Sequence, residues 1–306
     1  MEKKKTWVKI WRARQLYFLL LIPLLHLFIF KYVPMAGLQI AFKSFSNRKG
    51  IWGSPWVGLD NFIKFFNDRQ FSRLLINTLR ISIYQMTASF FVPIILALAL
   101  NIINQGAFKK TIQTLTYIPH FISLVVMIGM LMQLINPIVG IYGTICQALT
   151  GTRPVDILSI PEAFPHLYVW SGIWQGAGWG SIIYIAALAN ADQQLHEAAQ
   201  IDGASRLQRV WYIDIPTILP TATILLIMDA GKVMNVGFEK VFLLQNSLNL
   251  SYSEVLSTYV YRKSFGGGMP DFGFSTAAGM FNSVINLILI TIVNQVSRKL
   301  SETSLW

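Results

Sequence analysis

Long apolar stretches separated by polar segments run through the whole chain. Roughly 20 consecutive apolar residues let an α-helix cross the hydrocarbon core of a bilayer, because every backbone polar group is then satisfied within the helix. Six stretches have about this length, and we expect each to form a membrane-spanning helix: 15–35, 80–103, 112–136, 165–190, 217–236 and 273–297. The pattern therefore predicts an all-α polytopic membrane protein.

The composition agrees with this prediction. Hydrophobic residues make up 54% of the 306 residues and charged residues only 13%, against about 25% charged residues in soluble domains. The net charge of +11 is concentrated near the start, where six basic residues occupy the first fourteen positions: Lys3, Lys4, Lys5, Lys9, Arg12 and Arg14. Cations beside a membrane span are held on the cytoplasmic side, next to lipid headgroups. We therefore expect the bilayer, and not a nucleic acid, to be the partner of this charge, and six spans to leave both termini in the cytoplasm.

The predicted organisation is a basic cytoplasmic tail over 1–14, a six-span domain over 15–298 and a cytoplasmic tail over 299–306. The first span is expected to stay in the mature protein, because residues 31–35 offer no small-x-small site for signal-peptide cleavage. Outside the membrane, residues 43–72 should form a cap with a short amphipathic helix, N-capped by Asp60 or Asn61. This helix could rest on the bilayer or meet an external binding protein.

The predicted cytoplasmic loop 191–216 joins the fourth and fifth spans and combines charged residues with very small ones. Asp192 can cap a first short helix, and Gly203 can end it in the left-handed conformation. A second short helix over about 205–214 should stop before Pro216, because the residue before a proline disfavours helical geometry. We therefore expect two short helices lying across the membrane plane.

The fourth predicted span is rich in glycine and tryptophan. Three glycines recur on one helix face at every fourth position: Gly172, Gly176 and Gly180. One interpretation is close helix packing, with the tryptophans at the membrane interface. The other is a polar and aromatic pathway in which sugar rings stack and hydroxyls form hydrogen bonds, lined by Trp174, Gln175 and Trp179.

The fifth predicted span ends in ionisable residues. Asp229 and Lys232 are three residues apart, so they share a helix face, and Asn235 extends it by one turn. An ionisable residue at mid-span costs about 2.5–3.5 kcal/mol on insertion scales and usually faces the bundle interior or a water-filled cavity. These three residues are therefore expected to lie toward a translocation pathway or a partner subunit. The alternative is a salt bridge at the membrane rim.

The sequence contains no catalytic constellation. It lacks the Gly-x-x-x-x-Gly-Lys-[Ser/Thr] loop that cradles phosphates, so any ATP hydrolysis must belong to another chain. The four histidines have no metal-ligand spacing, and the single Cys146 can form neither an internal disulfide nor a cysteine metal cluster. We therefore expect a chain that is not an enzyme and that binds no metal or cofactor itself.

The predicted loop resembles the EAA loop of the membrane subunits of binding-protein-dependent ABC importers. It has Glu197-Ala198-Ala199, a glycine four residues after the second alanine, and an apolar-x-apolar-Pro ending. It departs from the family at Asp214, where an apolar residue is more common. Other segments resemble the polysaccharide-type branch of carbohydrate-uptake permeases, which have the six-span MetI-like fold: residues 56–62, 117–123, 174–181, 235–241 and 298–306.

The resemblance implies a permease subunit of an oligosaccharide importer in the bacterial cytoplasmic membrane. Two such permeases, usually different chains, would form the channel. A pair of ATPases using ATP and Mg would bind the two EAA loops. An extracytoplasmic solute-binding protein would deliver the sugar. The residues that match the coupling motif are Glu197, Ala198, Ala199, Asp202, Gly203 and Pro216. The alternatives are an ABC permease for a non-sugar solute and a secondary transporter, although the sequence lacks the internal repeat typical of the latter.

Overall fold

The computed structural model describes residues 11–103, 106–266 and 270–301. This described part is helical, apart from loops and one isolated antiparallel bridge between Lys43 and Trp56. Its contacts divide the chain into two units, one of residues up to 67 with 263–280, the other of residues 68–262 with those from 281 onward. The predicted basic tail and the predicted C-terminal tail lie partly outside the described residues.

The first unit begins with a long helical stretch and continues into a small cap. Its elements are α2 (Arg14–Leu27), a π-helical turn (Phe28–Tyr32), α3 (Val33–Met35), a 3-10 segment (Ala36–Phe42), α4 (Gly50–Gly53) and α5 (Asp60–Phe66). The first four form one candidate span, Arg14–Phe42, which is longer than the predicted 15–35.

Asn61 organises this cap. Its buried side-chain amide donates hydrogen bonds to the carbonyls of Ala41 and Lys43, at 2.9 and 3.0 Å. The prediction that Asp60 or Asn61 caps the amphipathic helix is wrong, because Leu59 holds the N-cap position. Asn61 instead uses its side chain to tie α5 to the preceding loop.

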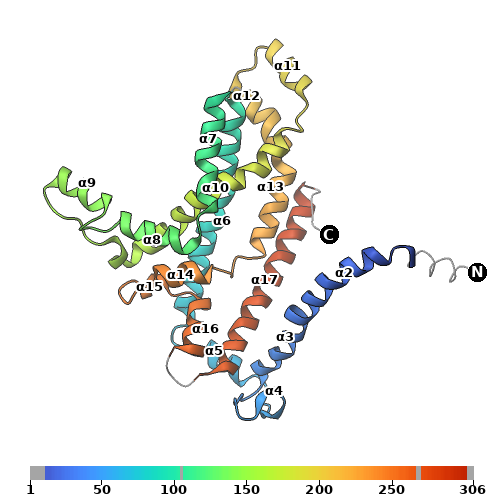
Figure 1. Cartoon of the computed structure of the whole chain (residues 1–306), viewed down its shortest axis with the longest axis vertical. Coiled ribbons are helices and arrows are strands. Elements are labelled where there is room, and N and C mark those ends of the chain that lie inside the picture. The colour runs from blue at the N-terminus through green and yellow to red at the C-terminus, as the bar shows by residue number, and fades with distance from the viewer. Residues whose placement is uncertain (1–10, 104–105, 267–269, 302–306) are drawn as a thin grey trace, which may run out of the picture. The chain divides into compact units, whose positions relative to one another are not determined.

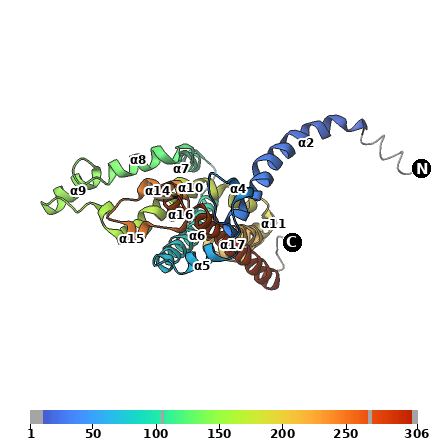
Figure 2. The same ribbon diagram turned by 90° about the horizontal axis from the view of Figure 1, so that it is seen from below.

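The second unit holds the remaining elements. They are α6 (Phe71–Ile102), α7 (Ala107–Tyr117), a 3-10 turn (Ile118–Phe121), α8 (Leu124–Leu134), α9 (Ile141–Thr150), 3-10 turns (Ile157–Ser159 and Pro161–Ala163), α10 (Phe164–Leu188), α11 (Gln193–Ile201), α12 (Arg206–Arg209), a π-helical segment (Val210–Asp214), α13 (Ile215–Ala230), α14 (Phe238–Leu244) and α15 (Leu250–Ser253). Two further helices pass from one residue range to the other: α16 (Leu256–Phe265) and α17 (Phe272–Ser301). Within the second unit α7, α10 and α6 pack together, and α14 lies beside α8 and α10 (Figures 1 and 2).

The candidate spans differ from the predicted ones in several places. Four stretches in the described part are long and apolar enough to cross a membrane: Arg14–Phe42, Phe71–Ile102, Arg206–Ala230 and Phe272–Lys299. The predicted span 112–136 is broken, because the helices on either side of Ile122 are bent by 106°. Pro119 lacks the backbone donor that would continue the first helix, and the Ser123 side chain caps the next. The fourth predicted span is present as α10, but its glycine and tryptophan residues leave it less apolar than the others.

Glycines let α10 approach its neighbours closely. A Cβ added at Gly172 would come within 3.3 Å of the Gln85 side chain on α6, and one at Gly178 within 2.0 Å of the Thr116 carbonyl oxygen on α7. Gly176 has open space around it. Close helix packing is therefore present at Gly172 and Gly178, but the tightest contact is at a glycine outside the predicted stripe, and the interfacial position of the tryptophans stays a prediction.

This difference predicts the effect of two alanine substitutions on stability. Gly178→Ala should destabilise the protein by about 1–3 kcal/mol, because the new methyl group overlaps backbone that must shift. Gly176→Ala, the matched control, should leave stability unchanged or raise it slightly, since alanine is the better helix former. Thermal unfolding of the purified complex measures both, and equal melting temperatures would contradict the packing described here.

Candidate functional site

The motif-bearing loop folds as a short helix that lies at one end of the second unit (Figure 1). The Asp192 carboxylate accepts a hydrogen bond from the Gln194 backbone N–H at 2.9 Å and caps α11. Gly203 follows the helix with a φ of +79°, a left-handed conformation that residues with a Cβ adopt only with strain. Both predictions for this first helix are confirmed.

The second half of the loop differs from the prediction. Ser205 starts α12 with a capping box to Gln208, and the helix then continues without a break through the π-helical segment into α13. Pro216 therefore lies near the start of a continuing helix, and the predicted stop before it is wrong. A proline ring normally clashes with the carbonyl four residues earlier, and the wider π-helical turn just before it lets the helix continue.

Most of the predicted coupling residues are exposed. Glu197, Ala198, Asp202, Gly203 and Pro216 are accessible to solvent, and Ala199 is half-buried. Large apolar side chains are exposed beside them: Leu195, Ile201 and Leu207 are 55%, 88% and 75% exposed. Contiguous exposed apolar surface is typical of a site that another protein or a membrane covers.

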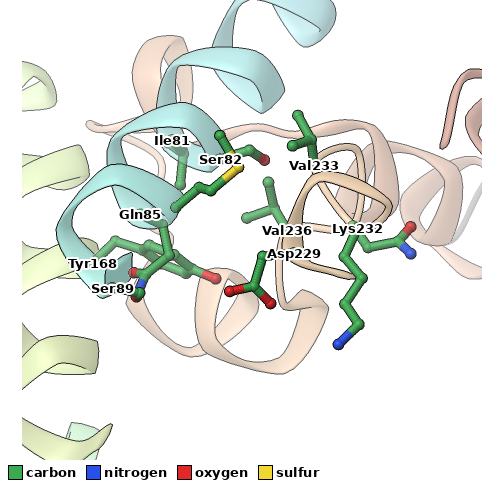
Figure 3. Close-up of a pocket in the computed structure, with 11 residues that line it drawn as sticks. Ile81, Ser82, Gln85, Ser89, Tyr168, Asp229, Lys232, Val233 and Val236 are labelled. Carbon is green, nitrogen blue, oxygen red and sulfur yellow. The ribbon is translucent and has the colours of Figure 1, made fainter. Parts of the chain in front are cut away.

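A pocket lined by both polar and apolar side chains lies where α13 ends, far along the chain from α11. Its cavity of about 180 Å³ is lined by α6, by Tyr168 of α10 and by the residues that end and follow α13 (Figure 3). Asp229, Lys232 and Asn235 all line it, so the structure brings these three predicted residues together. Since α13 ends at Ala230, however, Lys232 and Asn235 do not continue a helix face, and no ion pair joins the described side chains of Asp229 and Lys232.

Sequence reasoning missed the wall of this pocket that α6 supplies. Ser82, Gln85 and Ser89 follow one another at helical spacing and face the cavity. The Gln85 amide donates to the Ser89 hydroxyl, and its buried carbonyl oxygen has no hydrogen-bond partner in the described structure. The available signal was polar residues three and four apart in a charge-free span, since such residues usually face a cavity or another helix.

The three predicted residues of α10 do not join this pocket. The Gln175 side-chain amide donates to the Ile122 carbonyl at 2.8 Å, at the break between the two bent helices. Trp179 stacks on His120 with ring centroids 4.5 Å apart, and Trp174 is 53% exposed. The six residues predicted for the substrate pathway therefore form two separate groups.

Asp214 connects the loop of residues 191–216 to α6. Its carboxylate accepts a hydrogen bond from the Asn101 side-chain amide of α6 at 3.3 Å and lies 3.3 Å from His196 Nε2 of α11. Asp214 is only 3% exposed. Among the described residues no group of three potential metal ligands is close enough to hold a metal.

This chain is similar to known membrane transport proteins along nearly its whole length. Residues 105–302 match the family described as "Binding-protein-dependent transport system inner membrane component". Protein LplB of Bacillus subtilis (strain 168) is 40% identical over 96% of this chain and 92% of its own length. The polygalacturonan/rhamnogalacturonan transport system permease protein YteP of the same organism is 38% identical over 100% and 94%.

Solved structures give the same result for the fold. A chain in the crystal structure of a bacterial ABC transporter involved in the import of the acidic polysaccharide alginate matches with a TM-score of 0.88 and 37% identity, covering 97% of this chain and 99% of that one. The predicted MetI-like permease fold is confirmed, while the six-span count and the side of the termini remain predictions. Since the family match covers more than half of the sequence and its relatives align along nearly all of it, the chain belongs to the inner membrane components of binding-protein-dependent transport systems.

Proposed function

We propose that this chain is the permease subunit of an ATP-driven importer that takes up an oligosaccharide delivered by an extracytoplasmic binding protein. The observation that carries this proposal is α11, a helix with the Glu-Ala-Ala motif that is exposed at one end of the spans. The chain has no phosphate-binding loop of its own. The drive must then come from a separate ATPase, which uses ATP and Mg and docks on the surface formed by Glu197, Ala198, Ala199, Asp202, Gly203 and Pro216.

The nature of the substrate is supported by the relatives and by the pocket. One relative is a polygalacturonan/rhamnogalacturonan permease, and a similar structure holds an alginate importer in complex with alginate pentasaccharide-bound periplasmic protein. The pocket of this chain offers a carboxylate, an amine, amides and hydroxyls from Asp229, Lys232, Asn235, Gln85 and Ser89. These groups both donate to and accept from sugar hydroxyls.

A second permease subunit should complete the pathway. The pocket of about 180 Å³ is smaller than the roughly 300–1,000 Å³ of typical ligand sites. One chain therefore supplies one wall of the path, and a homologous subunit supplies the opposite wall. The exposed Trp174 and the stacked Trp179 lie on α10, outside the pocket, where they would contact either the sugar or this second subunit.

The complete complex in liposomes tests this function. ATPase activity should rise when the binding protein is loaded with an oligosaccharide and should not rise with the empty protein. A panel of uronate and neutral oligosaccharides shows whether the substrate is acidic or neutral. The pocket alone does not decide this, because Lys232 can pair with a uronate carboxylate whereas Asp229 repels it. Stimulation by an amino acid or a peptide instead of any sugar would contradict the proposal.

A further inference from the structure

The coupling helix is held to the spans by very few contacts. Short connections of residues 189–192 and 202–205 flank α11, and in the described part of the chain His196 makes the only hydrogen bond or ion pair from an α11 side chain to another helix. A polar cavity of about 490 Å³ lies beside this contact, lined by Gln193, Gln200, Arg206 and Arg209 among others. No tightly packed apolar interface therefore fixes α11 against the spans at this point.

Asp214, the partner of His196, lies directly before α13 and contacts α6. Asp214 ends the π-helical segment from which α13 continues, and the same carboxylate oxygen meets Asn101, one residue before the end of α6. Hydrogen bonds to an ionised carboxylate are about twice as strong as neutral ones. Three helices therefore meet at one buried carboxylate.

Both spans then run from this contact to the pocket lined by Gln85 and Asp229. Gln85 is sixteen residues from Asn101 on α6, and Asp229 is fifteen residues from Asp214. At 1.5 Å per residue these separations are roughly 22–24 Å along the helices. A displacement at Asp214 therefore acts on two continuous helices, each with an internal proline (Pro93 and Pro220), whose far parts line the candidate pathway.

We propose that Asn101, His196 and Asp214, here named the Asp214 junction, transmit the movement of α11 to α6 and α13. Asp214 and His196 are positioning residues, since neither would touch the sugar or ATP. This inference rests on the proposed function of α11 as the ATPase docking helix. It assigns a role to the carboxylate at the position where the EAA-type loop departs from the usual apolar residue.

The test compares transport with ATP hydrolysis in the reconstituted complex. His196→Ala and Asp214→Leu should leave the ATPase bound and hydrolysing, while sugar uptake per ATP falls about tenfold, the factor that corresponds to about 1.4 kcal/mol and to one hydrogen bond with a charged group. The double variant should be no worse than either single one, because both remove the same link. Gln193→Ala, which lines the same cavity without touching Asp214, is the control and should transport normally.

The outcomes separate this inference from the function on which it rests. Normal uptake per ATP in His196→Ala would overturn the junction, as would a double variant whose loss is the product of the two single losses. In either case the docking role of α11 would stand if Glu197→Lys still abolished uptake. Normal uptake in Glu197→Lys would overturn the docking role itself. If Asp214→Leu does not insert into the membrane, Asn101→Ala is tested in its place. Asn101→Ala removes the hydrogen-bond donor of α6, while the Asp214 carboxylate keeps its contact with His196.

Discussion

Glu197→Lys should abolish sugar uptake while leaving the amount of inserted protein unchanged. Glu197 is exposed on α11, and the described structure gives its side chain no partner within the chain. Its replacement should therefore change the free energy of unfolding by less than about 0.5 kcal/mol. At a docked interface, a charge of the wrong sign costs several kcal/mol, which corresponds to a loss of about 100-fold or more. Uptake of labelled oligosaccharide into vesicles, with the permease quantified by immunoblot, measures both quantities.

Two further variants sharpen this result. Gln194→Lys places the same charge on an exposed position of the same helix outside the motif, and it should transport at close to the normal rate. Gly203→Pro should also abolish uptake, because proline fixes φ near −65° whereas Gly203 has a φ of +79°. Normal uptake in either motif variant, or equal losses in Glu197→Lys and Gln194→Lys, would count against a specific docking surface.

Asp229→Asn should lower sugar uptake by about tenfold, while docking of the ATPase and its basal activity stay normal. The substitution keeps the shape of the side chain and removes its charge, and hydrogen bonds to charged groups contribute about 1.5–3 kcal/mol each. Glu162→Gln, an exposed carboxylate outside the pocket, is the matched control. Uptake measured against oligosaccharide concentration shows the effect, and unchanged uptake in Asp229→Asn would remove this pocket from the pathway.

Local chemistry made α11 predictable from the sequence. Asp192 before a short amphipathic run and Gly203 after it are strong start and stop signals, and both hold these positions in the structure. The apolar lengths likewise predicted helical structure in each expected stretch, because a membrane leaves few alternatives to a helix, although they predicted neither the break at Ile122 nor the end of α13 at Ala230. These features depend on residues that are close together in the sequence.

The features that sequence reasoning missed depend on contacts between distant residues. The π-helical segment before Pro216 lets the fifth span begin at Arg206, and no rule based on the proline alone predicts it. Asp214 contacts Asn101, 113 residues away, and His196 on another helix, so its departure from the family motif gave no indication of these partners. The pathway residues were grouped by residue type, but packing of α10 directs Gln175 to Ile122 and away from the pocket.

The central claim is that α11 receives force from a nucleotide-hydrolysing partner, and cross-linking from Ala198 tests it most directly. A photoreactive residue placed at this exposed position should cross-link to the ATPase subunit in the assembled complex, and the same residue at Leu149, which is 81% exposed on α9, should not. Cross-linking of Ala198 to the extracytoplasmic binding protein, or to no protein while the complex actively transports sugar, would contradict the claim.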